Sequence, residues 1–435
     1  MCLAIIFLLN DFSHMKFNSI NEKFIYYNLP VFLFSLIPFF LITGPFLSDL
    51  SVSLISVLFL IYCFKKKNFS YFKNKYFYFF LFFWGYLVFN SLINNFNLDS
   101  LKISLFYFRF GVFVIAIATL LAVDSKFIKY FFYCIFICFT CLIIDGFYEY
   151  FHENSHRVTS FFGEEKILGS YLSRLWPIFF GLSIFIIKQN KNILFLFILI
   201  FIFSEVLVFL SGERSAFFYI NLSAIFIILF SKKFFKLRLI TLSCSILLLV
   251  IISLINPTAK ERVLDRTLLQ MNLVDEKMNF IDKSNKDQNE VYIFSKEHTE
   301  IYKAAYKVFI DNKLLGAGVK NFRNICKNER YNTHRDSCST HPHNTYLQIL
   351  SEIGIIGFSF LLIILFYFCK YLFKHLILKI NGKYYFTDFE ICILSGILIY
   401  IWPIVPTGNL FNNWLSIVMI LNLPFLIWSR NLKNT

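Results

Sequence analysis

The stretch THPHNTYLQILSEIGIIGFSFLLIILF, residues 340–366, joins the longest polar segment of the chain to an uninterrupted apolar run. With the residues that follow it, the apolar run is long enough to cross a bilayer as a helix, because about 20 apolar residues span the hydrocarbon. His343 and Asn344 stand at the junction. We expect this polar pair to lie at a membrane surface, where water, a lipid headgroup and a sugar can meet.

The residues around this junction predict local structure. The side-chain oxygen of Asn344 or Thr345 can cap the following helix by accepting the unpaired amides of its first turn. The positive end of that helix disfavours an imidazolium, so His343 is predicted to stay neutral and able to accept a proton. Gly354 and Gly357 lie one turn apart, which favours close approach of a neighbouring helix. The pattern is typical of a general base at the end of a packed membrane helix.

Composition extends this interpretation to the whole chain. Hydrophobic residues make up 57% of the 435 residues, Phe alone accounts for 60, and the mean hydropathy is +0.63. Repeated apolar runs near 20 residues predict an all-α membrane protein with about twelve transmembrane helices and one large outer loop containing short helices. The chain divides into an N-terminal bundle of about nine spans (1–255), a loop region (256–343) and a C-terminal bundle of about three spans (344–435). The predicted spans are 29–45, 46–64, 76–95, 103–123, 127–149, 168–187, 192–210, 214–231, 237–255, 344–373, 387–404 and 409–428.

The basic residues that give the chain its net charge of +15 are concentrated in particular gaps between these spans. Lys and Arg gather before the first span, after the last, and in every even-numbered gap, whereas the short odd-numbered gaps carry few. This is the positive-inside pattern, and it predicts that both termini are cytoplasmic and that the odd gaps face outward. The same distribution argues against a nucleic-acid partner and in favour of membrane lipids.

The outer loop, 256–343, has its own organisation. Apolar residues repeat at helical spacing across 301–309, which predicts an amphipathic helix that packs on the protein or lies on the bilayer. Residues 262–290 begin as a short helix and end in a polar run, and 321–328 form another short helix. Cys326 and Cys338 are the cysteines of this loop, and a disulfide between them is expected in an oxidising compartment.

The pattern His343, Asn344, nine residues, Gly354, two residues, Gly357 resembles the signature of the O-antigen ligase and polymerase superfamily. Glu352 matches an acidic residue common in that helix. The segment Leu210-Ser-Gly-Glu-Arg-Ser-Ala216 resembles the family's Arg-Ser-Ala element, and the resemblance implies that Arg214 contacts the diphosphate of a lipid-linked donor. Arg suits that role because its planar fork binds phosphate oxygens in pairs and keeps its charge. The alternative is an arginine that reaches the headgroups beside Glu213.

Further arginines are candidates for the same site. The run that includes Arg157 also resembles the family, so this residue is a second candidate phosphate contact or else a solvated loop residue. Arg109 and Arg174 lie in apolar context below the outer ends of their spans. Charged groups at such depth usually face a cavity or a partner. Asp145 and Glu205 are their candidate partners if the role is an internal ion pair.

The chain departs from the family at one position. Where many members carry a second essential Arg, at the start of the amphipathic helix, this sequence has His298. Either His298 replaces that group, or Arg262, Arg266 or Arg323 does so in space.

The resemblance implies a glycosyltransferase of the bacterial inner membrane that acts on the periplasmic side without metal or cofactor. It would move a glycan from undecaprenyl diphosphate to a sugar of lipid A–core or another glycan acceptor, with inversion. His343 would take the proton of the acceptor hydroxyl, while Asn344 and Glu352 orient the histidine or the acceptor. The sequence contains no nucleotide-binding motif.

Three alternatives remain open at this point. A repeat-unit polymerase of the same superfamily would use the same donor and the same residues. A polysaccharide flippase or exporter would perform no chemistry, and a sensor with a degenerate site would not bind the donor. A zinc site can also be drawn through five loop residues, although their spacing matches no common zinc module. These are Cys326, His334, Cys338, His341 and His343.

Overall fold

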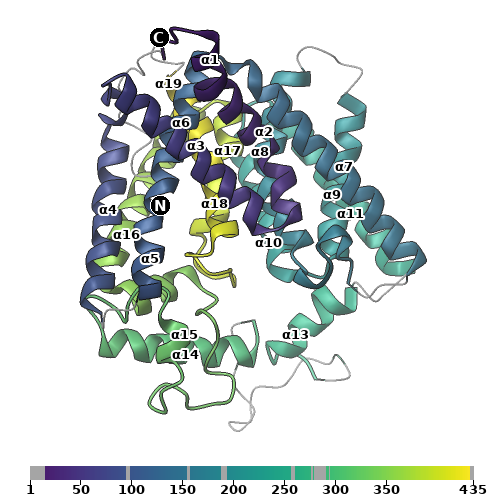
Figure 1. Ribbon diagram of the computed structural model, residues 1–435. Helices are drawn as coiled ribbons and strands as arrows, with labels where there is room; N and C mark the ends of the chain where they lie inside the picture. The colour runs from purple at the N-terminus through teal and green to yellow at the C-terminus, as the bar shows by residue number, and fades with distance from the viewer. Residues whose placement is uncertain are drawn as a thin grey trace.

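The computed structural model describes residues 15–94, 98–153, 157–187, 194–255, 260–275, 278, 291–292 and 294–431. The described part of the chain is helical and contains no β-strand. The helices form a bundle whose long members run in one general direction, with three shorter helices grouped at one end (Figure 1). We call that end, which carries the described residues between 260 and 343, the loop face.

A helix, or two consecutive helices, coincides with each of the twelve predicted spans. The first six are formed by α2 (Leu29–Thr43), α3 (Pro45–Lys65), α4 (Lys75–Ile93), α5 with α6 (Leu98–Phe106 and Phe108–Val123), α7 (Ile128–His152) and α8 (Leu168–Ile187). The other six are formed by α9 (Leu194–Leu210), α10 (Arg214–Phe230), α11 (Phe234–Ile255), α16 (Thr345–Ile380), α17 (Asp388–Ile401) and α18 with α19 (Asn413–Ile420 and Asn422–Asn431). A short helix, α1 (Ile20–Lys23), leads into α2.

Within the described residues, seven helical runs are long and apolar enough to cross a membrane, and α9 and α10 are apolar but shorter. The seven are Ile20–Thr43, Pro45–Lys65, Lys75–Ile93, Leu98–Val123, Ser125–His152, Phe234–Ile255 and Thr345–Ile380. The chain is therefore a multi-pass membrane protein. Gly44 separates α2 from α3 with φ 122° and ψ 179°, so the first two predicted spans are distinct helices.

Of the span boundaries that differ from the prediction, two have a clear local reason. Helix α16 continues to Ile380, and the Lys379 ammonium near its end donates to the carbonyls of Leu229 (2.6 Å) and Ser231 (3.2 Å) at the end of α10. The last span starts at Asn413, because the Asn412 side chain caps α18 by accepting from the Leu415 N–H.

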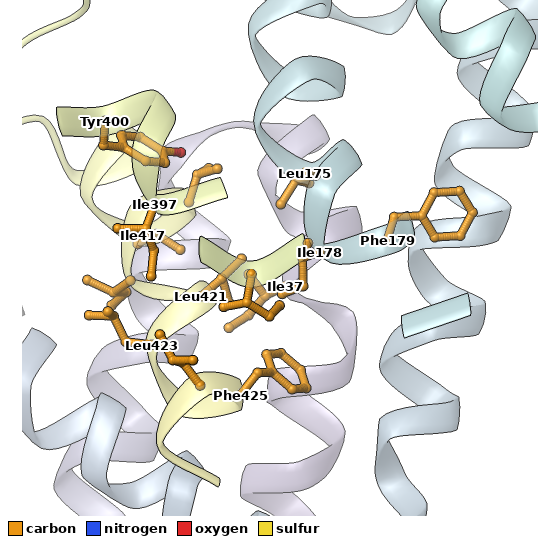
Figure 2. Packing of buried hydrophobic residues seen from close by; sticks show 14 of the residues in the cluster. Ile37, Leu175, Ile178, Phe179, Ile397, Tyr400, Ile417, Leu421, Leu423 and Phe425 are labelled. Atoms are coloured by element: carbon orange, nitrogen blue, oxygen red, sulfur yellow. The ribbon is translucent and has the colours of Figure 1, made fainter. Parts of the chain in front are cut away.

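The core of the bundle is filled by aliphatic and aromatic side chains from distant parts of the chain. Ile37 of α2, Ile178 of α8, Ile397 of α17 and Phe425 of α19 all lie in it and are almost fully buried (Figure 2). Lipid tails are as apolar as these residues, so exclusion from water does not hold such helices together. Packing and polar contacts do so instead.

A second, smaller core holds the loop face together. Helix α14 (Lys296–Asp311) turns Ile301, Ala305 and Val308 inward against α15 (Phe322–Ile325) and against Leu347 near the start of α16. The predicted amphipathic helix therefore packs on the protein. The helical turn Glu261–Asp265 and helix α13 (Arg266–Gln270) account for the start of the predicted segment 262–290, about half of which lies outside the described residues.

Candidate functional site

The histidine motif sits where the loop face meets α16. Asn344 is the N-cap of α16, and its side-chain oxygen accepts from the N–H groups of Tyr346 (3.0 Å) and Leu347 (3.1 Å). Its amide also donates to the Pro403 carbonyl at 2.6 Å. Asn344 therefore fixes both the start of the helix and the distance to the connection between α17 and α18, residues 402–412.

His343 is held by its backbone as well as by its ring. It has φ 53°, a left-handed conformation that costs about 1–2 kcal/mol for most residues. Its carbonyl accepts from the Thr407 N–H at 2.9 Å, and its Nε2 lies 3.0 Å from Ser339 Oγ. Such conformations persist where surrounding contacts impose them and cluster at functional sites.

Three histidines meet at this point from two segments. The His343 ring centroid lies 4.0 Å from that of His341 and 5.5 Å from that of His298. His298 stands in the first turn of α14, where Ser295 Oγ lies 2.8 Å from its Nδ1. The sequence places His298 more than forty residues before the motif, but the fold makes it a neighbour of the predicted base.

Burial lowers the pKa values of these three histidines. It lowers the pKa of His343 to about 4, with a smaller contribution from His298. Burial also lowers the pKa of His341 to about 3, with His343 as the next cause. The pKa of His298 falls through burial and the nearby Arg214 guanidinium. Burial is therefore the largest cause that favours the neutral state predicted for His343.

A cavity of about 330 Å³ opens beside His298, and four arginines line it. Arg214 comes from the start of α10 and Arg157 from the segment before α8, while Arg262 and Arg266 come from the helical turn Glu261–Asp265 and from α13. The volume lies within the range of small-molecule sites. The remaining lining residues are Gly212, Glu213, Ser215, Gln270, Phe294, His298 and Pro406. We call this cavity the arginine cavity.

Helix ends add to its positive potential. Arg214 begins α10 and His298 lies in the first turn of α14, so two helices direct their N-termini at the cavity. The carboxylate of Glu213 is already used: it accepts from the N–H groups of Gly169 (2.7 Å) and Ser170 (3.0 Å) at the start of α8. The cavity therefore presents a net positive charge, which suits an anionic ligand.

Arg262 depends on a glycine. Gly212 has φ 65°, and a Cβ built there would come within 2.4 Å of Arg262 Cδ and Nε. The guanidinium of Arg262 can lie over this turn only because the turn has no side chain. Of the residues expected to supply the second basic group, His298, Arg262 and Arg266 all reach the cavity, whereas Arg323 belongs to α15 and is not among its lining residues.

Arg174 does not line the arginine cavity. Its side chain is buried among α8, α10 and α17, with its guanidinium carbon 4.9 Å from the Tyr219 ring centroid and 5.7 Å from that of Tyr400. Its charge still acts on the carboxylate of Glu213, which lines that cavity, so the donor-binding role of Arg174 stays a prediction.

The partners of the arginines that lie deep in the spans also differ from the predicted ones. Arg109 pairs with Asp49 of α3 at 2.6 Å, while Asp145 accepts from Ser160 Oγ. Glu205 forms a buried ion pair with Arg238 of α11. Ion pairs were expected at this depth, but the partners come from helices that sequence position did not suggest.

The first glycine of the motif, Gly354, serves a loop rather than a helix. Gly354 interrupts α16 with φ 65° and ψ −169°. A Cβ there would lie 2.2 Å from the Leu314 carbonyl oxygen, and one at Gly316 would lie 2.4 Å from the Glu352 carbonyl carbon. The predicted close approach of a neighbouring helix is therefore wrong at Gly354, since the approaching element is the loop 313–318.

This loop replaces the hydrogen bonds that the break removes from α16. The N–H groups of Ala317 and Gly318 donate to the carbonyls of Ser351 and Glu352, both at 2.8 Å. The N–H of Ile355 donates to the Lys313 carbonyl at 2.9 Å. The break thus joins the loop face rigidly to the helix that carries the histidine.

Glu352 supports this junction from inside. Its Oε1 accepts from the Phe322 N–H at 3.2 Å, and its Oε2 accepts from Gln348 Nε2 at 2.9 Å. Gln348 in turn donates to Asn409 Oδ1 at 2.8 Å. The contacts of Glu352 therefore reach α15 and the connection 402–412 rather than the His343 ring.

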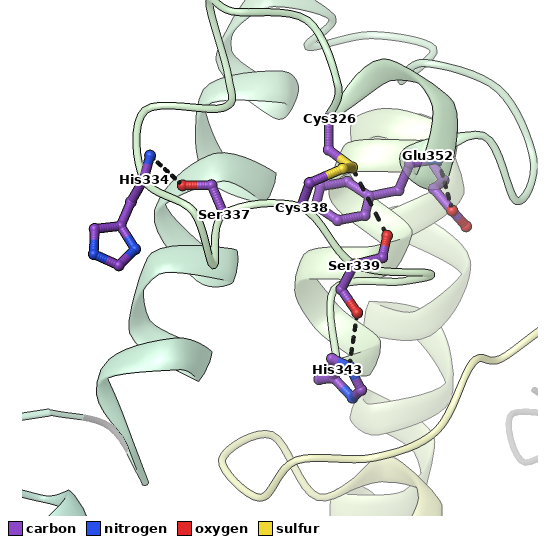
Figure 3. Close-up of a disulfide and its surroundings, with 8 residues drawn as sticks. Cys326, His334, Ser337, Cys338, Ser339, His343 and Glu352 are labelled. Carbon is purple, nitrogen blue, oxygen red and sulfur yellow. Dashed lines mark hydrogen bonds between the residues drawn. A yellow bond between two sulfur atoms is a disulfide. The ribbon is translucent and has the colours of Figure 1, made fainter.

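Cys326 and Cys338 form a disulfide (Figure 3). Ser339 lies between this disulfide and His343, as the same view shows. Two of the five residues of the alternative zinc site are joined in this disulfide and are not free thiolates, and among the described residues no group of three His, Cys, Asp or Glu side chains is arranged to hold a metal ion.

Some residues of the site were not found from the sequence. Thr407 and Pro403 hold the histidine motif, but they were assigned only to a short gap or a span end, and no motif marks them. Pro403, Pro406 and Gly408 are the signal that an irregular, structured connection would give.

Comparison with known proteins gives one finding about the family. Residues 194–362 match a family model described as O-antigen ligase. The match covers α9 to the first part of α16, including Arg214, the loop face and the histidine motif. No curated protein matches the chain.

Proposed function

We propose that this chain, whose residues 194–362 belong to the O-antigen ligase and polymerase superfamily, transfers a glycan from a lipid diphosphate to an acceptor hydroxyl at the membrane surface. The donor is undecaprenyl diphosphate carrying the glycan, and the acceptor is a sugar of lipid A–core or a similar glycan. The loop face is placed on the periplasmic side of the bacterial inner membrane, with both termini in the cytoplasm.

The observation that carries this proposal is the position of a neutral His343 beside the arginine cavity. His298 contacts the His343 ring and lines the cavity, so it links the base to the four guanidinium groups. A glycosyl transfer from a diphosphate needs both functions close together, because one proton is removed while two phosphates depart as an anion.

The reaction then follows from the groups present. The acceptor oxygen attacks the anomeric carbon as its proton passes to a ring nitrogen of His343. The bond between that carbon and the diphosphate oxygen breaks, and its electron pair leaves with the diphosphate. Arg214, Arg262 and the helix N-termini stabilise the departing charge. Attack opposite the leaving group gives inversion.

The depressed pKa of His343 fits this order of events. In the empty site the imidazole is neutral at pH 7 and able to accept a proton, but a pKa of about 4 makes it a weak base. Binding of the diphosphate places negative charge near the ring, which favours the imidazolium and raises the pKa. The base is therefore strongest when the donor is bound.

The test is transfer by purified protein in detergent, given a lipid-linked glycan donor and lipid A–core. His343→Ala should lower the rate about 10²- to 10⁴-fold, the range for loss of a general base. Arg214→Ala and Arg262→Ala should each lower it about 10²-fold or more. Lys307→Ala, which removes an exposed cation from α14 outside the cavity, is the matched control. Full activity of His343→Ala at normal abundance would refute the proposal.

The same assay separates the ligase from the polymerase. Product that forms only when the core acceptor is present identifies a ligase. A ladder of longer lipid-linked glycans without the core identifies a polymerase. Donor that crosses vesicle membranes without any product would instead favour the flippase or exporter.

A further inference from the structure

A second cavity, of about 620 Å³, lies on another side of the connection 402–412. It is bounded by the start of α3, by α5 and α6, and by residues 411–413. The Ser100 hydroxyl of α5 donates to the Val319 carbonyl at 2.7 Å, which ties this wall to the loop face. Its lining residues are Pro45, Asp49, Ser53, Lys102, Ile103, Phe106, Tyr107, Arg109, Phe110, Lys320, Phe411, Asn412 and Asn413.

The connection 402–412 forms part of the wall of both cavities. Pro406 lines the arginine cavity, whereas Phe411 and Asn412 line the second one. Between them, the N–H of Thr407 donates to the His343 carbonyl, and His341 Nε2 lies 3.2 Å from the Thr407 carbonyl oxygen. The histidine motif is therefore fixed to the segment that separates the two cavities.

The second cavity is also basic. It contains Lys102, Arg109 and Lys320 against one carboxylate, Asp49, which Arg109 already engages through two nitrogens. Within the described residues neither lysine forms a salt bridge. The other carboxylate near Lys320 is that of Glu352, whose oxygens accept from Phe322 and Gln348. Two positive charges are left for a ligand.

Lys320 is the more informative of the two lysines. Its side chain is half-buried, and its backbone has φ 55°, in the left-handed region. Burial and the nearby Arg323 lower its pKa. An ammonium held partly out of water beside other cations is unfavourable unless an anion joins it. Aromatic rings and the two asparagines complete a wall suited to a sugar that carries a charge.

We propose that the second cavity binds the acceptor, as a lipid-anchored saccharide that bears a phosphate or carboxylate near its reacting hydroxyl. This rests on the proposed function, and it assigns the two substrates to opposite sides of His343. The acceptor hydroxyl then reaches the anomeric carbon from the side away from the diphosphate, which is the geometry that inversion requires.

The experiment compares steady-state constants for donor and acceptor in Lys320→Ala, Lys102→Ala and the double variant. Each single change should raise the KM for a phosphorylated acceptor about 10-fold or more, because a charge-assisted contact is lost. The donor KM should stay within about 2-fold. Lys313→Ala, an exposed lysine of the same loop that lines neither cavity, should leave both constants unchanged.

A second arm varies the ligand. With an acceptor stripped of its phosphates, the wild type should lose affinity about as much as Lys320→Ala does, and the variant should no longer distinguish the two acceptors. A rise in donor KM alone would overturn the assignment while leaving the transferase intact. Transfer rates that depend on the acidic phospholipid content of nanodiscs, but not on the phosphates of the acceptor, would show that a bulk lipid headgroup occupies the cavity. That result would also overturn the assignment of the acceptor to this cavity. No transfer by wild type to any acceptor would refute the proposed function itself.

Discussion

At the scale of single residues, His343 combines a strained backbone with a ring kept neutral by burial. The left-handed φ turns the residue out of the path that leads into α16, and the bond to Thr407 holds it there. A histidine one position later would occupy the N-cap of the helix, which Asn344 fills. The function of the motif therefore depends on the order His-Asn, in which the second residue starts the helix and the first stays outside it.

The pH dependence of transfer should show the depressed pKa of His343. Its ordinary value of about 6.5 falls to about 4 in the folded protein, so the imidazole stays neutral as the pH drops from 6.5 towards 4. The acid limb of kcat/KM should accordingly lie near pH 4, since that ratio reports the free enzyme. Over the same window the unfolded chain takes up a proton that the folded chain does not. The free energy of unfolding therefore decreases as the pH decreases from 6.5 towards 4.

The measurement is a rate profile from pH 3.5 to 8 with a lipid-linked donor, on protein whose fold is checked at each pH. Replacing His298 by Gln removes one neighbour that lowers the pKa, so the limb should move upward. A limb near pH 6.5 in the wild type would contradict the buried, neutral histidine.

The sequence reveals only the contiguous part of this site. His343, Asn344 and Arg214 belong to short motifs, and the structure places them at the ends of α16 and α10. Thr407 and Lys320 belong to no motif and contribute through contacts with partners far away in the chain. Arg174 does not line the arginine cavity, because depth in a span can be predicted, whereas the direction that a side chain faces around the helix cannot.

At the scale of elements, α16 is the part that joins chemistry to scaffold. Its 36 residues are about 54 Å long at 1.5 Å per residue, well beyond the hydrocarbon thickness of about 30 Å. The break at Gly354 divides this length, and the loop 313–318 pairs with the amides and carbonyls that the break exposes. The apolar pattern predicts the helix, but it gives no sign of a loop bonded into it.

Gly354→Ala should destabilise the protein and reduce transfer. The left-handed φ costs about 1–2 kcal/mol for alanine, and the new methyl would lie 2.2 Å from the Leu314 carbonyl oxygen, so the loop must also move. Thermal unfolding in detergent and the transfer rate measure the two effects.

Gly382 gives a matched control, since it has φ 69° and nothing within 4 Å of an added Cβ. Gly382→Ala should show the cost of φ alone, with transfer unchanged at equal abundance. Equal losses of activity in the two variants would mean that the loop contact is unimportant.

At the scale of the whole molecule, buried charge and helix packing determine how the bundle closes. The twelve predicted spans coincide with helices because hydropathy and length follow directly from residue type. The pairing of helices does not follow in this way. Arg238 of α11 meets Glu205 of α9, and its guanidinium carbon also lies 4.2 Å from the Trp176 ring centroid of α8. One charge pair thus specifies contacts among three helices.

Glu205→Ala should therefore cost about 3–5 kcal/mol, because it leaves the buried Arg238 without its counter-ion. The midpoint of thermal unfolding in detergent should drop clearly. The double variant Glu205→Ala, Arg238→Met should recover most of the loss, since an apolar pair removes the unpaired charge. Asp388→Ala, at the half-buried first residue of α17, is a comparison in which the carboxylate loses its contacts with the backbone N–H groups of residues 232–234. No recovery in the double variant would contradict the ion-pair explanation.

The disulfide between Cys326 and Cys338 has a consequence for the maturation of the protein. Cys338 immediately precedes Ser339, whose hydroxyl contacts His343 Nε2, and Cys326 Sγ lies 3.7 Å from the Ser339 carbonyl oxygen. The position of the proposed base, His343, therefore depends on a covalent bond. This bond forms after the helices have been inserted, and only in a compartment where thiols are oxidised. Newly made chains that have not met an oxidant should be present in the membrane in normal amount and still be inactive. Under the proposed function, catalysis would therefore begin only after the loop has been exported to an oxidising compartment.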